Sequence, residues 1–288
     1  MPTVLITGTS KGIGLATALA FARAGYQVHA TMRNPEATPE LAQMAARENL
    51  NIVITKLDVD SDQSVAQGIA AILQAGPLDV LVNNAGIERV GSVEDLPLAD
   101  FRQVMETNYF GVIRCLQAVL PHMRQRRSGC IVNVASVSGH ISIGPLAAYS
   151  ASKFALEALS EALAGEMKSF GVHVAVVEPG IIDTAMAQRI GDPEAPSLYP
   201  QQLRIAAMFA ATLQQPDPPS LVADKILDIV TSGTWELRHP VGATAIPFLG
   251  WRKQMSDEEW VALASSDDET WYQRIEHDFG IDTRPHSH

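Results

Sequence analysis

The sequence predicts an α/β protein with a single doubly wound parallel sheet and helices on both faces. Three observations support this fold class. Short runs rich in β-branched residues alternate with longer stretches of helical pattern. Several short runs are apolar throughout, which is typical of strands buried on both faces of a parallel sheet. The 288 residues, of which 47% are hydrophobic, can bury one large core.

Seven runs are expected to form the strands of this sheet. In chain order they are Val4 to Thr7, Gln27 to Met32, Asn51 to Leu57, Val80 to Asn83, Gly129 to Ala135, Val172 to Glu178 and Trp235 to Val241. Because helical stretches separate most of them in strict alternation, we expect right-handed crossovers between parallel strands.

The helical stretches have recognisable starts and ends. They are Ile13 to Ala24, Pro39 to Glu48, Ser61 to Gln74, Leu98 to Arg126, a helix that opens near Tyr149, Leu203 to Leu213 and Ser220 to Ser232. The first ends at Gly25, and Ser61 is a plausible cap for the third. The stretch from Leu98 to Arg126 is long enough for one helix with a bend.

The chain after Ile182 departs from this alternation. Two runs rich in proline, Asp192 to Pro196 and Gln215 to Pro219, bracket the helical piece at Leu203 to Leu213. Such an insertion is more typical of a mobile cover over a site than of a second domain. We therefore expect one domain over residues 1–288, with residues 185–219 covering the substrate.

Residues 242–288 form a C-terminal extension that is rich in large aromatic residues. It carries Trp251, Trp260, Trp271 and Tyr272 among acidic residues. Side chains of this size rarely remain in water. The extension is expected to pack on the body of the protein or on a second subunit.

Charge and composition exclude several classes of function. A net charge of -11 and a pI near 5.1 argue against a broad nucleic-acid or anionic-membrane surface. Cys115 and Cys130 are the two cysteines, and their spacing implies neither a zinc site nor a disulfide framework. The start of the chain does not resemble a signal peptide, and no apolar run approaches the ~20 residues of a membrane span. We expect a cytoplasmic protein.

A glycine-rich turn follows the first strand and opens the first helix. It runs Thr7-Gly8-Thr9-Ser10-Lys11-Gly12-Ile13-Gly14. Backbone N–H groups at a helix N-terminus bind phosphate, and the glycines allow close approach. The spacing is GxxxGxG and not GxGxxG, and no GKS or GKT follows that would indicate a Walker loop. The alternative is a tight turn without a ligand.

The end of the second strand bears on the choice of cofactor. It runs Thr31-Met32-Arg33 and offers no carboxylate for a free ribose. Arg33 and Lys11 could both meet a 2′-phosphate through charge-assisted hydrogen bonds. We therefore favour NADP(H) over NAD(H). In the competing interpretation Arg33 is a solvated loop residue.

Tyr149 and Lys153 are four residues apart and therefore share one face of a helix. A nearby ammonium favours the phenolate and lowers the pKa of a tyrosine, so Tyr149 could exchange a proton with an alcohol or a ketone. The hydroxyl of Ser136 could hold the substrate oxygen. By itself such a pair is more often surface decoration.

Taken together, these motifs resemble those of the classical short-chain dehydrogenases/reductases, whose fold is of the Rossmann type. The resemblance covers about Thr3 to Thr184. Its motifs occur in the family's order: the glycine turn, Asp58-Val59, Asn83-Asn84-Ala85-Gly86, Asn108, Ser136, the YxxxK pair, and Pro179-Gly180 with Thr184. One motif alone would be weak evidence, but the full set in register is highly specific.

The resemblance implies a role for each matching residue. The glycine turn, with Gly8, Ser10, Lys11, Gly12, Ile13 and Gly14, would bind the pyrophosphate. Asp58 and Val59 would hold the adenine, and Asn84, Ala85 and Gly86 would line the adenosine ribose. Pro179, Gly180, Ile182 and Thr184 would seat the nicotinamide carboxamide.

The resemblance also implies the catalytic set. Tyr149 would act as general acid or base, Ser136 would hold the substrate oxygen, and Lys153 would bind the nicotinamide ribose. Asn108 would kink its helix and hold a water that completes a proton relay. The family usually forms homodimers or homotetramers through its long helices, and we expect the same here.

Simpler interpretations of several of these residues remain open. Asp58 could cap the helix that starts near Ser61, Asn108 could be satisfied locally within its helix, and Ser138 is the nearest rival of Ser136.

The substrate side is expected to be mostly apolar. It would be built from His140 to Leu146, from Ile181 onward, and from four residues of the insertion, Met186, Leu203, Met208 and Phe209. Such walls suit a lipophilic ketone, aldehyde or secondary alcohol. By analogy with branches that act on steroids or retinoids, a bulky hydrophobic substrate is favoured. His140 could touch the substrate, but more often such a histidine is a loop residue.

Two other functions compete with an NADP(H)-dependent oxidoreductase. One is a regulator that senses NADP(H) without turnover, although such relatives usually lose the active tyrosine. The other is an isomerase or dehydratase acting on nucleotide sugars, which usually carries a GxxGxxG loop and a larger C-terminal domain. The chain keeps Tyr149 and has neither of the latter features.

Overall fold

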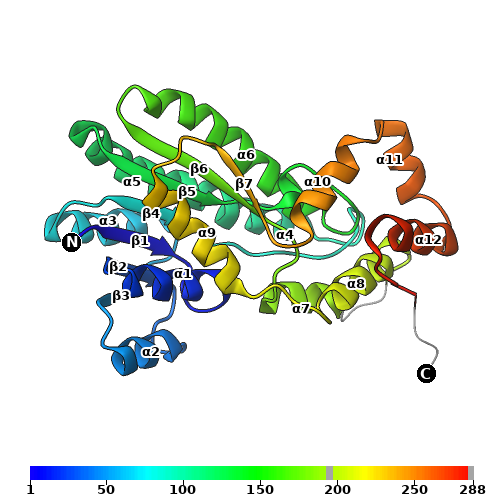
Figure 1. Cartoon of the computed structure of the whole chain (residues 1–288), viewed down its shortest axis with the longest axis horizontal. Coiled ribbons are helices and arrows are strands. Elements are labelled where there is room, and N and C mark those ends of the chain that lie inside the picture. The colour runs from blue at the N-terminus through cyan, green and yellow to red at the C-terminus, as the bar shows by residue number, and fades with distance from the viewer. Residues whose placement is uncertain (193–196, 285–288) are drawn as a thin grey trace.

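The computed structural model describes residues 1–192 and 197–284, and its centre is a seven-stranded parallel sheet (Figure 1). The strand order is β3-β2-β1-β4-β5-β6-β7. The strands are β1 (Thr3–Thr7), β2 (Gln27–Met32), β3 (Ile52–Lys56), β4 (Val80–Asn83), β5 (Gly129–Val134), β6 (Val172–Pro179) and β7 (Arg238–Val241). The predicted fold class is thus confirmed.

The strand order reverses between β1 and β4, which lie side by side although β2 and β3 separate them in the chain. Val4 pairs with Val28 of β2 on one side and with Val80 of β4 on the other. In doubly wound sheets ligands bind at such a switch point, outside the carboxyl ends of the strands.

Three helices cover each face of the sheet (Figure 1). The first face is covered by α1 (Gly12–Arg23), α2 (Glu40–Glu48) and α9 (Pro219–Ser232), and the second by α3 (Asp62–Ala75), α5 (Gly111–Arg126) and α6 (Ala147–Lys168). Val4 and Ile6 point to the first core and Leu5 to the second, because successive strand residues face opposite sides. This burial on both faces explains the unbroken apolar runs of the sequence.

The stretch predicted as one bent helix, Leu98 to Arg126, is continuous but not uniform. It consists of α4 (Leu98–Met105), a π-helical turn η1 (Glu106–Phe110) and α5. The turn contains Asn108, which is completely buried. Single π-turns inside helices are often found at functional sites.

One strand starts later than the sequence indicated. The last strand was expected from Trp235, but β7 begins at Arg238. Trp235 instead leaves half of its side chain exposed, and its ring contacts that of His173 at 3.6 Å between centroids. This aromatic contact, and not strand pairing, explains the large side chain at that position.

The remaining segments gather beyond the carboxyl ends of the strands (Figure 1). They are the 3₁₀ turn η2 (Val137–Gly139), α7 (Ala185–Gly191), α8 (Gln201–Thr212), α10 (Ala245–Lys253), α11 (Asp257–Ala264) and α12 (Asp268–Phe279). Part of the first proline-rich run, residues 193–196, lies outside the described residues. The described segments share a third apolar core in which Ile205 of α8 and Trp271 of α12 are almost fully buried.

Among the described helices, none is both long and apolar enough to cross a membrane.

Candidate active site

A cavity of about 550 Å³ opens at the carboxyl ends of the strands. It brings together all but one of the predicted cofactor and catalytic residues. The predicted residues that line it are Gly8, Ser10, Lys11, Gly12, Ile13, Gly14, Arg33, Asp58, Val59, Asn84, Ala85, Gly86, Ser136, Tyr149, Lys153, Pro179, Gly180, Ile182 and Thr184. The exception is Asn108, which lies behind the wall.

The glycine turn packs so closely that side chains would not fit. Gly8 has a φ of +73°, and a Cβ there would lie 2.7 Å from the Cα of Ala85. A Cβ at Gly14 would lie 2.2 Å from the carbonyl oxygen of Gly8. The side-chain amide of Asn84 donates to the carbonyls of Thr7 and Gly8 at 2.9 and 3.0 Å, which fixes the turn against the end of β4.

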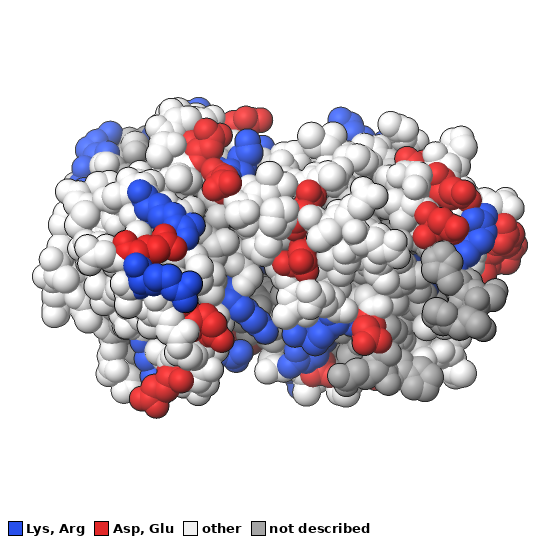
Figure 2. Space-filling view, turned by 60° about the horizontal axis from the view of Figure 1, so that its bottom comes forward, with Lys and Arg blue, Asp and Glu red and all other residues white. Residues whose placement is uncertain are grey.

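The N-terminus of α1 faces this cavity and has no side-chain cap at Lys11. The first N–H groups of a helix have no partner within the helix, so they can bind an anion. Lys11 and Arg33 are exposed and line the same cavity. Neither side chain forms a hydrogen bond or ion pair with another described residue, although the charge of Arg33 acts on Asp60. In Figure 2, acidic and basic side chains are interspersed, and Lys or Arg side chains border a hollow near the middle of this face.

Asp58 does not cap α3. The hydroxyl of Ser61 does so, by accepting a hydrogen bond from the N–H of Ser64 at 3.2 Å. The Ser64 hydroxyl accepts from the backbone N–H of Asp58, and one Asp58 carboxylate oxygen accepts from the N–H of Asp60. The remaining acceptor capacity of Asp58 is therefore directed to the cavity that it lines.

Tyr149, Ser136 and Lys153 line the cavity and lie close to one another. The pKa of Tyr149 is raised to about 12, mainly because the phenol is buried, although the nearby Ser136 hydroxyl opposes this and the charge of Glu88 adds to it. The sequence predicted the opposite direction, a pKa lowered by Lys153. The effect of burial on the phenol is the larger one, because the Lys153 ammonium donates its hydrogen bond to the Val134 carbonyl and not to Tyr149.

Lys153 is 4% exposed and donates a hydrogen bond from Nζ to the carbonyl of Val134 at 2.8 Å. Its Nζ lies 5.6 Å from the centroid of the Tyr149 ring. Burial lowers the pKa of Lys153 to about 8, and the charge of Glu157 opposes this. The ammonium is therefore close to the Tyr149 ring, but its hydrogen bond goes to the end of β5. Burial destabilises its charged form.

Asn108 connects the π-turn to two other parts of the site. Its Oδ1 accepts from the N–H of Ile87 at 2.8 Å, and its Nδ2 donates to the Ile87 carbonyl and to the Ser152 hydroxyl, both at 2.9 Å. Ser152 in turn donates to the Tyr149 carbonyl at 2.7 Å. These partners are far from Asn108 in sequence, so the amide is not satisfied locally within its helix.

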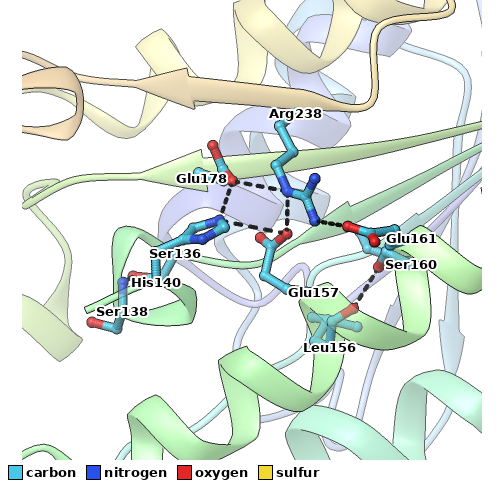
Figure 3. A network of polar contacts seen from close by, with 10 residues as sticks. Ser136, Ser138, His140, Leu156, Glu157, Ser160, Glu161, Glu178 and Arg238 are labelled. Carbon is cyan, nitrogen blue, oxygen red and sulfur yellow. Dashed lines mark hydrogen bonds and ion pairs between the residues drawn. The ribbon is translucent and has the colours of Figure 1, made fainter. Parts of the chain in front are cut away.

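A buried ionic network lies next to the turn that carries Ser136 (Figure 3). His140 Nε2 contacts Glu178 at 2.7 Å and Glu157 at 3.7 Å, and the Arg238 guanidinium contacts Glu157 at 3.0 Å. His140, Glu157 and Glu178 have the spacing of metal ligands, with their ligand atoms within 4.8 Å of one another. Arg238 already supplies a positive charge to both carboxylates, so the group is better described as a salt-bridge network.

His140 therefore belongs to this network and does not line the cavity. Hydrogen bonding to Glu178 is the largest influence that raises the pKa of His140, against desolvation. The following residues Ile141, Ile143 and Leu146 do line the cavity, as predicted. Ser138 lines it too, but its backbone N–H donates to Ser136 Oγ at 3.1 Å, and it is Ser136 whose hydroxyl influences Tyr149.

The end of the cavity where we expected the substrate is mostly apolar, but its composition differs from the prediction in two respects. Met186, Met208 and Phe209 line it, whereas Leu203 is 67% exposed and points away. Leu203 is wrongly placed in the prediction because the inward face of α8 carries Ile205, Met208 and Phe209, at helical spacing. The C-terminal extension adds four residues that were not assigned to the site, Phe248, Trp251, Trp260 and Trp271.

Four charged residues of the cavity were also missed: Asp60, Glu88, Arg89 and Arg189. Glu88 follows the Asn-Ala-Gly motif, and Arg189 belongs to α7; they form an ion pair at 2.6 Å. A pattern search does not find them, because 101 residues separate them in the chain.

The cavity fits a dinucleotide. Its polar end has the close-packed glycine turn, the uncapped helix N-terminus and two unpaired cations, which together suit phosphate groups. Pro179, Gly180 and Thr184 continue this wall toward Tyr149. Gly180 leaves room there for Thr244, whose hydroxyl accepts from the N–H of Ile181 at 2.9 Å.

Comparisons with known proteins agree with this geometry. A family model described as short chain dehydrogenase matches residues 2–195. The uncharacterized oxidoreductase YusZ of Bacillus subtilis is 38% identical over 247 residues, which are 83% of this chain and 88% of that protein. Retinol dehydrogenase 8 of Bos taurus is 43% identical over 210 residues, 70% of this chain and 67% of that protein.

Among solved structures, a variant of actinorhodin polyketide ketoreductase, determined with NADPH, superposes with a TM-score of 0.75 at 28% identity. The match covers 86% of this chain and 97% of that one. The chain belongs to the short-chain dehydrogenase/reductase family of oxidoreductases.

Proposed function

We propose that this protein is an NADP(H)-dependent oxidoreductase that interconverts a hydrophobic ketone or aldehyde and the corresponding alcohol. The observation that carries the proposal is the meeting of Tyr149, Ser136 and Lys153 in one cavity, between a phosphate-binding turn and an apolar wall. The polyketide ketoreductase structure with NADPH supports the cofactor class.

NADP(H), when bound, supplies or accepts the hydride. Tyr149 gives its phenolic proton to the substrate oxygen during reduction and removes a proton from the alcohol during oxidation. The raised pKa of Tyr149, about 12, favours the protonated form and so the role of an acid. Ser136, beside the phenol, donates to the same oxygen while negative charge develops there.

Lys153 and Asn108 support the proton transfer. Lys153 holds its position through the Val134 carbonyl, and with a pKa of about 8 it can lose a proton near neutral pH. Asn108 holds Ile87 and Ser152, and Ser152 is bonded to the Tyr149 backbone. We assign Asn108 a positioning role between the π-turn and the helix of Tyr149.

The substrate class follows from the apolar end of the cavity. Met186, Met208, Phe209 and three tryptophans offer few hydrogen-bond partners to a polar molecule. The likeness to retinol dehydrogenase 8 supports a bulky lipophilic alcohol or carbonyl compound. The cytoplasmic location and the homodimer or homotetramer expected from the sequence remain predictions.

The first test is turnover of a panel of lipophilic ketones and alcohols, followed at the absorbance band of the reduced nicotinamide. Replacing Tyr149 by Phe removes the proton donor but little volume, so turnover is expected to fall by a factor of about 10² to 10⁴. NADPH affinity is expected to stay within about twofold. Unchanged turnover in Tyr149→Phe would remove Tyr149 from the mechanism. If the wild-type protein binds NADPH but turns over no compound of the panel, the alternative function, a regulator that senses NADP(H), would be favoured.

The second test concerns the cofactor. Arg33→Ala is expected to weaken NADPH binding by about 1.5–3 kcal/mol, the value of a hydrogen bond to a charged group, and to leave NADH binding nearly unchanged. Titration of both nucleotides by calorimetry measures the difference. Equal losses for both would show that Arg33 does not recognise the 2′-phosphate.

A further inference from the structure

Glu88 is a buried carboxylate in the cavity wall that the proposed reaction does not use. It is 6% exposed and follows Ile87, whose N–H and carbonyl are both held by the Asn108 amide. The backbone that carries Glu88 is therefore fixed to the same π-turn that positions the helix of Tyr149. Ionised carboxylates are rarely buried this deeply without full pairing.

Only one of the two Glu88 oxygens has a partner. Arg189 Nε and Nη2 both donate to Oε1, at 2.9 and 2.6 Å. Oε2 accepts no hydrogen bond from the described residues and is not among the fully buried side-chain atoms that lack a partner. Glu88 lines the cavity, and Oε2 is the carboxylate oxygen that Arg189 leaves available to a donor there. A carboxylate has about four acceptor positions, so Oε2 can receive a donor without breaking the pair.

The Asn108 contacts with Ile87 and Ser152 link Glu88 to the catalytic part of the cavity. Glu88 and Tyr149 both line it, and the charge of Glu88 contributes to the raised pKa of the phenol. Met186 and the tryptophans of the extension form apolar walls of the same cavity. Arg89 and Gln103 line it as well, but the Arg89 guanidinium is bonded to Asp100, Gln103 and the Glu88 carbonyl. Arg189 leaves 55% of its side chain exposed, so solvent screens its charge more than that of Glu88.

We propose that Glu88 is a specificity-determining residue that selects substrates with a hydrogen-bond donor close to the reacting carbon, and best of all a positively charged amine. This inference rests on the proposed function and narrows its substrate class to amphipathic molecules. The donor meets Glu88 Oε2, and the apolar remainder extends toward Trp251, Trp260 and Trp271.

The test compares three alcohols that share one alkyl chain and react at the second carbon: the secondary dodecanol, the vicinal dodecanediol and the vicinal aminododecanol. Each is oxidised by the wild-type protein with NADP⁺ near neutral pH, where the amine is charged. We expect kcat/KM to rise in that order, with the amino alcohol at least about tenfold above the plain alcohol. Equal values for the three compounds would overturn the inference and leave the proposed function intact.

Three variants separate recognition from structure. Glu88→Leu is expected to reduce the kcat/KM of the diol and the amino alcohol to that of the plain alcohol. Glu88→Gln, which keeps an acceptor but no charge, is expected to lose the preference for the amine and keep part of the preference for the diol. Arg189→Gln breaks the ion pair but keeps the carboxylate, so the order of the three substrates is expected to persist.

If both Glu88 variants lower kcat/KM by the same factor for all three alcohols, Glu88 only fastens α7 to the cavity wall, and the proposal fails. Should Glu88→Leu not fold, Glu88→Gln and Arg189→Gln still carry the comparison. Absence of turnover for all three compounds with the wild-type protein would contradict the proposed function, and this inference with it.

Discussion

The two ends of the cavity are built in different ways. At the nucleotide end the backbone packs closely: the glycine turn after β1 contacts the Asn84 to Gly86 segment after β4, and the Asn84 side-chain amide bonds to the turn. At the substrate end, large side chains form the surface, from α7, α8 and the C-terminal helices. The nucleotide end is thus fixed by neighbouring strands, whereas the substrate end depends on segments that are distant in sequence.

This difference indicates how each end responds to mutation. Added atoms at the nucleotide end clash with backbone that cannot move away, so they should affect cofactor binding. Lost atoms at the substrate end leave a cavity in the third core, so they should affect folding and substrate choice.

The largest effect is expected for Trp271→Ala. Trp271 is 2% exposed in the third core, and removal of a buried aromatic side chain typically costs about 3–5 kcal/mol. Unfolding by denaturant should show this loss, while NADPH affinity stays unchanged. The matched control is Trp235→Ala, since Trp235 is 51% exposed and lies away from the cavity. A comparable loss of NADPH affinity in Trp271→Ala would show that the two ends are not separable.

Compared with Trp271→Ala, Gly8→Ala is expected to lose less folding stability but more NADPH affinity. The positive φ and the contact of 2.7 Å with the Ala85 backbone together suggest a cost of about 2–4 kcal/mol. Because the turn must shift, NADPH affinity should fall at least tenfold in a fluorescence titration. Gly165→Ala is the control, since a Cβ there meets nothing within 4 Å inside α6. Normal NADPH affinity in Gly8→Ala would contradict a main-chain phosphate site.

Lys153 lies between the two ends, and its burial makes stability depend on pH. A pKa of about 8 in place of 10.5 corresponds to about 3 kcal/mol. Below pH 8 the lysine is charged in both states and the full penalty applies. Between pH 8 and 10.5 the folded state releases its proton while the unfolded chain keeps it, so wild-type stability rises with pH.

Lys153→Met is therefore expected to be inactive but more stable than wild type at neutral pH. The gain should be about 1–2 kcal/mol, because the Val134 carbonyl loses its partner and offsets part of the penalty. Denaturant unfolding at neutral pH and above pH 10.5 measures it, and the gain should vanish at the higher pH. A gain that is independent of pH would show that Lys153 is not strained by burial.

The contrast between the two ends also explains what could be predicted from the sequence. The fold and the placement of residues such as Gly14, Asp58 and Tyr149 followed from contiguous patterns. Gly14 and Asp58 come shortly after strands, and Tyr149 and Lys153 have helical spacing within α6. Leu203 was misplaced because its direction depends on which face of α8 packs inward. Glu88 has no local pattern that marks it.

The pKa values of Tyr149 and Lys153 also could not be predicted from the sequence. The spacing of Tyr149 and Lys153 places them on one face but does not reveal that Lys153 Nζ bonds to the end of β5, or that burial dominates both pKa values. The tryptophans of the extension were expected to pack on something. Their contribution to the cavity wall depends on how α10, α11 and α12 gather beyond the carboxyl ends of the strands (Figure 1).

The π-turn at Glu106–Phe110 has one more consequence. A π-turn accommodates one residue more than the α-helical turn it replaces, so the helix on either side continues in a rotated register. Deleting a single residue there would restore a regular α-helix and place a different side chain opposite Ile87 in place of Asn108. Since Asn108 fastens both Ile87 and Ser152, the alignment of Glu88 with Tyr149 depends on that extra residue.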